Sequence, residues 1–292
     1  MNLAAYIPFS LAFIMFAMGL SLQIVDFKRI IEYPKAMVLG LACQILLLPL
    51  LAWLIASALS LNPLLSTGLL LIALCPGGVT SNLASHLAKG NNALSVSLTA
   101  VSSVITVFTL PLFMVLLADT SNNNVSLPLL PAIKQLATMT ILPLCLGMGI
   151  NHLANGLVQR HLNKITLLAA LLFCLMIASV WYQQWDNIRF SAVEAGVAVT
   201  LLNLIALLLG WWLAKTAKLQ QAEQLTLSLE VGLQNSALAV FVAVNMIGNG
   251  QLAIPASVYS VIMVCSAVSV IIIGRIQTAR INRDPTAQIS NP

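Results

Sequence analysis

The chain has 292 residues, of which 60% are hydrophobic and only 7% are charged, and its formal net charge is +5 at pH 7. In soluble domains about a quarter of the residues are charged, so this chain has too few charges to cover a surface that faces water. The composition excludes a soluble globular protein. The 13 basic residues lie between apolar runs and form no patch, which argues against a nucleic-acid-binding protein.

Nine apolar segments are long enough to form membrane-spanning helices, because a helix needs roughly 20 apolar residues to cross the hydrocarbon core. In chain order they are 6–25, 36–57, 64–88, 92–117, 129–151, 163–183, 190–213, 222–247 and 253–275. The first segment has no basic region before it and no small-residue cleavage site, so we expect a retained span and not a signal peptide. The sequence therefore predicts an all-α, polytopic membrane protein.

The basic residues predict how these helices are oriented. If the N-terminus lies outside, only Lys134 and Arg189 fall on the outer side. The eleven basic residues on the inner side are Lys28, Arg29, Lys35, Lys89, Arg160, Lys164, Lys215, Lys218, Arg275, Arg280 and Arg283. Because inner loops carry the excess of Lys and Arg, we expect an outer N-terminus and a cytoplasmic C-terminus. The short loops and the lack of a targeting leader favour a bacterial inner membrane.

Two of the predicted spans contain residues that interrupt a helix. In the third, the apolar run ends at Cys75 and Pro76-Gly77-Gly78-Val79-Thr80-Ser81-Asn82 follows. In the eighth, Glu230-Val231-Gly232-Leu233-Gln234-Asn235-Ser236 lies near mid-span. Proline removes a backbone donor and glycine lowers helix stability. Open backbone at membrane depth persists only where it is buried in protein or lines a wet cavity, so both breaks predict a binding site.

The two breaks also relate the two halves of the chain. When spans one to four are aligned with spans six to nine, each break falls in the third member of its set, and aligned spans run in opposite directions. This pattern predicts an inverted repeat with span five unpaired, and paired breaks of this kind mark the binding site in transporters. We expect a first repeat of four spans over 1–128, broken near 76–82. A second repeat of five spans follows over 129–275, broken near 230–236, and 276–292 is a cytoplasmic tail.

Polar residues gather around the breaks. Glu230 is the acidic residue predicted deep in a span, where a charge is costly enough to indicate function. Ser95 and Thr99 are four residues apart and share one helical face. The remaining polar residues of this set are Gln44, Ser81, Asn82, Gln234 and Asn235. Their oxygens, with freed carbonyls, suit a hard cation. The alternatives are a protonated structural Glu230, and hydroxyls that bond the carbonyl one turn back.

Several motifs resemble those of the bile acid:sodium symporter family, and the chain is identified as a prokaryotic member. The similar stretches are Phe16-Ala17-Met18-Gly19-Leu20, Cys75-Pro76-Gly77-Gly78-Val79-Thr80-Ser81-Asn82, Ala93-Leu94-Ser95 with Thr99, and Glu230-Val231-Gly232-Leu233-Gln234-Asn235-Ser236-Ala237-Leu238. The similarity extends from Tyr6 to Arg275. It implies a core domain with two crossing discontinuous helices, a flanking panel domain, and two sodium sites behind the crossing.

The resemblance also implies which residues hold the two sodium ions. The first ion would be held by Ser81, Asn82, Ser95, Thr99 and Glu230. The second would be held by Gln44, Glu230, Val231, Leu233 and Gln234. No cofactor beyond these coupling ions is implied. Bile-acid-carrying members show Trp-His-Asn on the last span, where this chain has Met263-Val264-Cys265. Pantoate-like acids, keto acids and bile-acid-like molecules are therefore all candidate substrates.

Together these features predict a sodium-coupled symporter, and not an enzyme, that carries a small organic anion by alternating access. Its partners would be the anion, sodium ions and the lipid bilayer, and the sequence does not predict an oligomeric state. Two sodium ions would balance Glu230 and a monoanion. The anion would rest on amides at half-helix N-termini, near Thr80 and Asn235. A proton-coupled carrier that titrates Glu230 and a passive channel are the alternatives.

Overall fold

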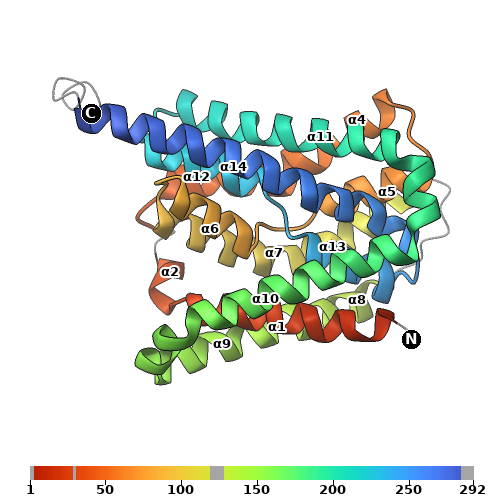
Figure 1. Cartoon of the computed structure of the whole chain (residues 1–292), viewed down its shortest axis with the longest axis horizontal. Coiled ribbons are helices and arrows are strands. Elements are labelled where there is room, and N and C mark those ends of the chain that lie inside the picture. The colour runs from red at the N-terminus through yellow and green to blue at the C-terminus, as the bar shows by residue number, and fades with distance from the viewer. Residues whose placement is uncertain (1–2, 29–30, 119–127, 284–292) are drawn as a thin grey trace.

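The computed structural model describes residues 3–28, 31–118 and 128–283, and these residues form an all-helical fold, as predicted (Figure 1). The helices of the first part are η1 (Leu3–Tyr6), α1 (Ile7–Ser21), α2 (Ile24–Lys28), α3 (Pro34–Ala42), η2 (Cys43–Leu47), α4 (Leu48–Ala58), α5 (Pro63–Ala73), α6 (Val79–Leu87) and α7 (Asn92–Ala118). Those of the second part are α8 (Leu129–Leu136), η3 (Ala137–Ile141), α9 (Leu142–Leu153), α10 (Asn155–Gln183), α11 (Trp185–Thr216), α12 (Gln221–Gly232), α13 (Ser236–Phe241), η4 (Val242–Met246), η5 (Gly250–Leu252) and α14 (Ala253–Arg283).

The helices have the length and surface of a multi-pass membrane protein. Six helical segments within the described residues are long and apolar enough to cross a membrane, namely Pro34–Ala58, Asn92–Leu116, Leu129–Leu153, Asn155–Gln183, Trp185–Thr216 and Gly250–Gln277. Ile7–Ser21, Pro63–Ala73 and Ser236–Met246 are shorter apolar helices. Large apolar side chains such as Phe9, Leu153 and Phe190 are more than three-quarters exposed. Lipid, and not water, is the solvent that this surface fits.

Two of the long helices contain a π-helical turn just before a proline. The turn η2 precedes Pro49, and η3 precedes Pro143. A proline ring collides with the carbonyl four residues earlier and cannot bond it. For these prolines that carbonyl belongs to Ile45 and Met139, each inside the π turn. The wider turn accommodates the proline without ending the helix, and η2 also carries the buried Gln44.

Two helical segments are interrupted in the middle of the fold, at the glycine-containing motifs. The first interruption lies between α5 and α6 and the second between α12 and α13. The two extended linkers meet, because Gly77 and Gln234 pair as an isolated antiparallel bridge. The amide of Asn235 also donates to the carbonyl of Pro76 over 2.8 Å. Each linker thereby satisfies backbone groups of the other at a depth where water is not available to do so.

The helices form two packed groups with the crossing between them. Figure 1 shows α1, α9 and α10 together on one side, and α11, α12 and α14 on the other. The first group packs closely, because a Cβ on Gly19 or Gly147 would overlap the backbone of the facing helix. The two groups touch where α10 contacts α14 and α11, and α1 also contacts α13 at the crossing. The crossing linkers therefore lie beside the seam between two helical groups.

Candidate ion and substrate site

The carboxylate of Glu230 is fully buried in the last turn of α12 and faces α7. Ser95 Oγ donates to Glu230 Oε1 over 2.5 Å, and Thr99 Oγ1 donates to Glu230 Oε2 over 2.7 Å. Both hydroxyls are completely buried. Since Ser95 and Thr99 are one turn apart, one face of α7 supplies a hydroxyl to each carboxylate oxygen.

Helix α6 brings an amide and a third hydroxyl to the same point. Asn82 Oδ1 lies 2.8 Å from Ser95 Oγ and 3.2 Å from Thr99 Oγ1. A Cβ placed on Gly77 would lie 2.6 Å from Glu230 Oε2, 3.2 Å from Ser81 Oγ and 3.3 Å from Thr99 Oγ1. These oxygens thus surround one side of Gly77. The structure brings together all five residues that the resemblance assigned to the first ion.

In this cluster the Asn82 amide presents its oxygen, and not its nitrogen, to two hydroxyls. Ser95 and Thr99 each carry one hydroxyl proton, but each faces both Asn82 Oδ1 and a carboxylate oxygen of Glu230. With the amide in this orientation the two hydroxyl protons leave acceptor contacts unfilled, and unsatisfied polar groups are costly when buried; a turned Asn82 amide would supply protons from Nδ2 instead. A hard cation binds such oxygens without needing protons. Carboxylate, amide and hydroxyl oxygens packed at these distances therefore fit a cation site.

The second predicted set meets on the backbone of α12. Gln44 Nε2 donates to the carbonyl of Glu230 over 2.8 Å, and Gln234 Nε2 donates to the carbonyl of Val231 over 2.7 Å. Gln44 therefore contacts the backbone of Glu230 and not its carboxylate. Leu233 follows in the extended linker, after its amide closes the last turn of α12 onto Leu229. The Oε1 atoms of both glutamines are buried and have no hydrogen-bond partner within the described part of the chain, so two acceptors remain beside these carbonyls.

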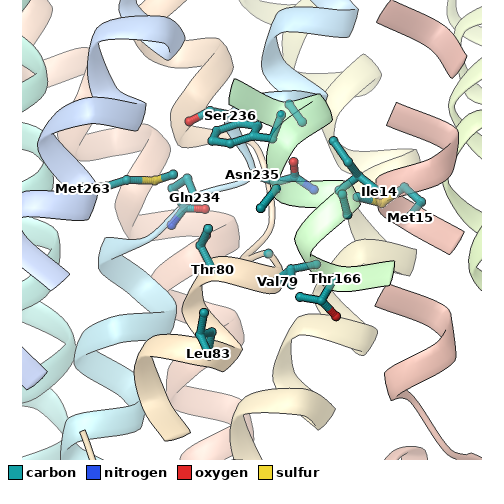
Figure 2. A pocket seen from close by; sticks show the side chains of 15 residues that line it. Ile14, Met15, Val79, Thr80, Leu83, Thr166, Gln234, Asn235, Ser236 and Met263 are labelled. Carbon is teal, nitrogen blue, oxygen red and sulfur yellow. The ribbon is translucent and has the colours of Figure 1, made fainter. Parts of the chain in front are cut away.

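A cavity of about 110 Å³ lies between the crossing and helices α1 and α10 (Figure 2). Its apolar lining comprises Ile14, Met15, Val79, Leu83, Ala169, Ala170, Phe173, Ala237 and Met263, and its polar side chains are Thr80, Thr166, Gln234, Asn235 and Ser236. In Figure 2, Ile14 and Met15 stand on one side and Met263 on the other, with Thr80, Gln234 and Asn235 between them. None of the residues that line this cavity is charged.

Hydrogen-bond donors from both broken helices face this cavity. It is lined by Gly78, Val79 and Thr80 at the start of α6, and by Asn235 and Ser236 at the start of the helix that runs through α13 and η4. Helix N-termini carry a partial positive charge. The amides of Gly78, Asn235 and Ser236 already donate to Ser81 Oγ and to the carbonyls of Pro76 and Gln234, whereas those of Val79, Thr80 and Ala237 have no such partner within the described residues. Asn235 Oδ1 accepts from the amide of Leu238 over 3.1 Å, which leaves its Nδ2 as a donor. Thr80 and Asn235, the residues expected near a substrate, both line the cavity.

Other cavity residues were not expected from the sequence. Ser236 Oγ is buried and has no hydrogen-bond partner among the described residues, and its place directly after Asn235 was a usable signal. The sequence gave no such signal for Thr166 and Phe173 on α10 or for Met15 on α1. A threonine or an apolar side chain in a membrane helix looks the same in the sequence whether it faces lipid, a neighbouring helix or a cavity.

A polytopic helical chain with two interrupted helices around a buried, oxygen-lined carboxylate has the make-up of a membrane transporter. The model of the Sodium Bile acid symporter family matches residues 8–191. The chain belongs to this family, so the family prediction is confirmed.

Named relatives agree with this assignment. The chain is 33% identical over 255 residues to a probable sodium/metabolite cotransporter BASS2, chloroplastic, of Oryza sativa subsp. japonica, covering 87% of this chain and 60% of the relative. It is 30% identical over 263 residues to the uncharacterized sodium-dependent transporter YocS of Bacillus subtilis, covering 89% and 79%. It is 27% identical over 238 residues to the ileal sodium/bile acid cotransporter of Homo sapiens, covering 81% and 68%.

The share of each relative that the chain covers limits which of that relative's properties can be assigned to the chain. The chain spans about three fifths of the length of the rice cotransporter BASS2. The relatives are named as sodium-dependent transporters and cotransporters, so they are transporters and not enzymes. Their names give no support to a proton-coupled carrier.

Proposed function

We propose that this protein is a sodium-coupled symporter that carries a small organic monoanion across a cell membrane by alternating access. The observation that carries the proposal is the convergence of hydroxyl and amide oxygens on the fully buried carboxylate of Glu230. The family supports sodium as the coupling cation. Two sodium ions, the carboxylate and a monoanion sum to zero, since +2 balances −1 and −1.

The ligand sets follow the two clusters. The first ion is assigned to Ser81, Asn82, Ser95, Thr99 and Glu230. The second ion is assigned to Gln44, Glu230, Val231, Leu233 and Gln234. The unpartnered oxygens of Gln44 and Gln234 support this second set. An amide oxygen and nitrogen are nearly the same size, so each glutamine can turn its oxygen toward the ion.

The anion is assigned to the uncharged cavity. Its carboxylate would accept from the backbone amides of Val79, Thr80 and Ala237, and from the side-chain donors of Thr80, Asn235 and Ser236. Its apolar part would lie against Ile14, Met15 and Phe173. A space of about 110 Å³, with polar side chains between two apolar walls, favours a small hydroxylated or keto acid, such as a pantoate-like substrate, over a steroid.

Coupling between the sites follows from their shared wall. Gly78 lines the cavity, and on the ion side its amide and carbonyl are both bonded by the Ser81 hydroxyl, over 3.2 Å and 2.8 Å. A substrate anion and Glu230 would therefore repel one another across a thin layer of protein. Two like charges about 6 Å apart repel by about 3 kcal/mol at an effective dielectric constant near 20. Sodium removes this repulsion, so sodium and substrate raise each other's affinity.

The architecture assigned to this function is an inverted repeat, 1–128 and 129–275, with its N-terminus outside a bacterial inner membrane and 276–292 as a cytoplasmic tail. Helices α1 and α8 to α10 would form the panel, and the helices around the crossing would form the core. Because the cavity lies on the seam between these groups, rocking of one group against the other would open it to alternate sides.

The proposal is tested with Glu230→Gln in proteoliposomes and in purified protein. We expect this variant to lose sodium-driven uptake of organic acids and stabilisation by sodium, while it still inserts into the membrane. Glu194→Gln is the matched control, since Glu194 is exposed on α11. Uptake by Glu230→Gln that still follows a sodium gradient at the wild-type rate would refute the assignment.

A further inference from the structure

The carbonyl of Gly232, the last residue of α12, is bonded by side chains from two other helices. Tyr259 of α14 donates its hydroxyl over 2.8 Å, and Asn203 of α11 donates Nδ2 over 2.7 Å. Asn203 Nδ2 also lies 3.4 Å from the Tyr259 oxygen. Both side chains are 0% exposed. Carbonyls at a helix end lack partners within their own helix, and here two buried donors converge on a single one.

The donors are rigidly placed. Asn203 and Leu207 lie one turn apart on α11, and the Leu207 side chain occupies the space where a Cβ on Gly232 would lie. The carbonyl of Leu207 accepts the Ser228 hydroxyl over 2.9 Å. Helix α11 is therefore held against the backbone of α12 by side chains on both helices. The Asn203 Oδ1 has no hydrogen-bond partner within the described residues, so the polar contacts of Asn203 are with the Gly232 carbonyl and Tyr259.

Along the chain this clamped carbonyl lies between the carbonyls of Val231 and Leu233, through which these two residues are assigned to the second ion. The carbonyls of Glu230 and Val231 are bonded by Gln44 and Gln234, which belong to the proposed ion site. The Gly232 carbonyl points instead to a pair of residues outside that site. Because each peptide unit is planar and joined to its neighbours through only two soft dihedrals, holding the Gly232 unit restricts how its neighbours can turn.

We propose that Asn203 and Tyr259 are positioning residues for the second sodium site. By clamping the Gly232 carbonyl, they hold the peptide units of Val231 and Leu233 in the orientation that ligation requires. Neither side chain touches the ion. This inference rests on the proposed sodium-coupled function and adds to it a source of rigidity. Affinity and discrimination among cations both depend on how rigidly the ligands are held.

The test uses Tyr259→Phe, which removes one oxygen atom and keeps the ring. Purified protein is titrated with sodium alone, in a potassium background of constant ionic strength, and thermal stabilisation is followed. Loss of one net hydrogen bond corresponds to a shift of about three- to tenfold in an equilibrium constant. We expect the half-saturating sodium concentration to rise by that factor and the preference for sodium over lithium to fall, beside the modest fall in melting temperature without sodium that the loss of a buried hydrogen bond brings by itself.

Two further variants complete the design. Tyr6→Phe is the control, because it also removes a tyrosine bond to a carbonyl, that of Leu175 at 3.1 Å, but on the far side of the seam. Its sodium response should match the wild type. Asn203→Leu is the second probe if Tyr259→Phe folds poorly, and it should shift sodium binding in the same direction. The double variant should be less than additive, since both donors serve one carbonyl.

The outcomes separate this inference from the function on which it rests. A lower melting temperature for Tyr259→Phe or Asn203→Leu, with an unchanged half-saturating sodium concentration, would show a purely structural role and overturn the inference. In that case Glu230→Gln and Thr99→Ala would still weaken the sodium response, and the sodium site would stand. If those two variants also responded to sodium like the wild type, the site and its positioning residues would fail together.

Discussion

Replacing Gly77 with alanine tests the cation cluster with a single added carbon. The new Cβ would lie 2.6 Å from Glu230 Oε2, 3.2 Å from Ser81 Oγ and 3.3 Å from Thr99 Oγ1. Ordinary van der Waals contact begins near 3.4 Å, so the carboxylate oxygen would have to move by at least 0.8 Å (3.4 − 2.6). Gly77 is not among the described residues with positive φ, so the backbone itself accepts alanine.

The displacement predicts a large loss of sodium affinity. A shift of 0.8 Å (3.4 − 2.6) stretches the 2.7 Å bond from Thr99 to Glu230 beyond hydrogen-bonding range. Hydrogen bonds to charged groups contribute about 1.5–3 kcal/mol, which corresponds to a factor of about 10 to 150 in binding. We therefore expect the half-saturating sodium concentration for Gly77→Ala to rise by at least tenfold.

The assay is the sodium titration of thermal stability described above, repeated as sodium-driven uptake in proteoliposomes. Gly196→Ala is the control, since a Cβ there meets nothing within 4 Å. Gly78→Ala places a carbon beside the substrate cavity and away from the ion cluster. The atoms nearest to its Cβ would be those of Asn235, at 3.8 Å, an ordinary contact distance, so sodium binding without substrate should persist. A Gly77→Ala protein that binds sodium as tightly as the wild type would show that the carboxylate does not hold the ion at this point.

Other substitutions probe the remaining contacts. Thr99→Ala should raise the half-saturating sodium concentration at least severalfold, whereas Thr109→Ala, which loses only a bond to its own helix, should leave it unchanged; equal titrations would argue against ligation. Phe173→Ala removes an apolar wall of the cavity and should raise the KM for the transported acid roughly tenfold, while the exposed Leu171→Ala should not. Gly210→Ala would place a Cβ 2.6 Å from the Leu227 carbonyl and should destabilise the fold by about 1–3 kcal/mol, measured as a lower melting temperature without sodium.

The helical fold could be predicted because the membrane restricts the backbone so strongly. A long apolar run in lipid has to be a helix or a closed barrel strand. Six of the nine predicted segments coincide with helical segments long enough to cross a membrane, and the other three contain the shorter apolar helices. The membrane also made the interruptions near Pro76 and Gly232 recognisable as a site, since open backbone at that depth persists only where it is buried in protein or lines a cavity. The π turns before Pro49 and Pro143 were not predicted as such, because a proline indicates a bend and not the manner in which the helix accommodates it.

The oxygen cluster could be predicted in type but not in geometry. A carboxylate is costly in a span, so Glu230 stands out from an apolar background, whereas Ser95 and Thr99 share α7 with five other Ser and Thr residues. The motifs then assigned them to one site. Their hydrogen-bond partners could not be predicted from the sequence, because Ser95 and Glu230 are 135 residues apart in the chain. Their convergence emerges only when both hydroxyls are seen to lie between the Asn82 amide and the Glu230 carboxylate.

The cavity wall shows where sequence reasoning fails for a physical reason. In a soluble protein an apolar residue indicates burial, because the alternative is water. In a membrane protein the alternative is lipid, so Met15 and Phe173 in the cavity carry the same apolar signal as the lipid-facing Leu171. Ion ligands are polar and distinguishable, whereas the surface that selects the substrate is mostly apolar. It follows that the coupling ion of such a transporter is easier to predict from its sequence than the acid it carries.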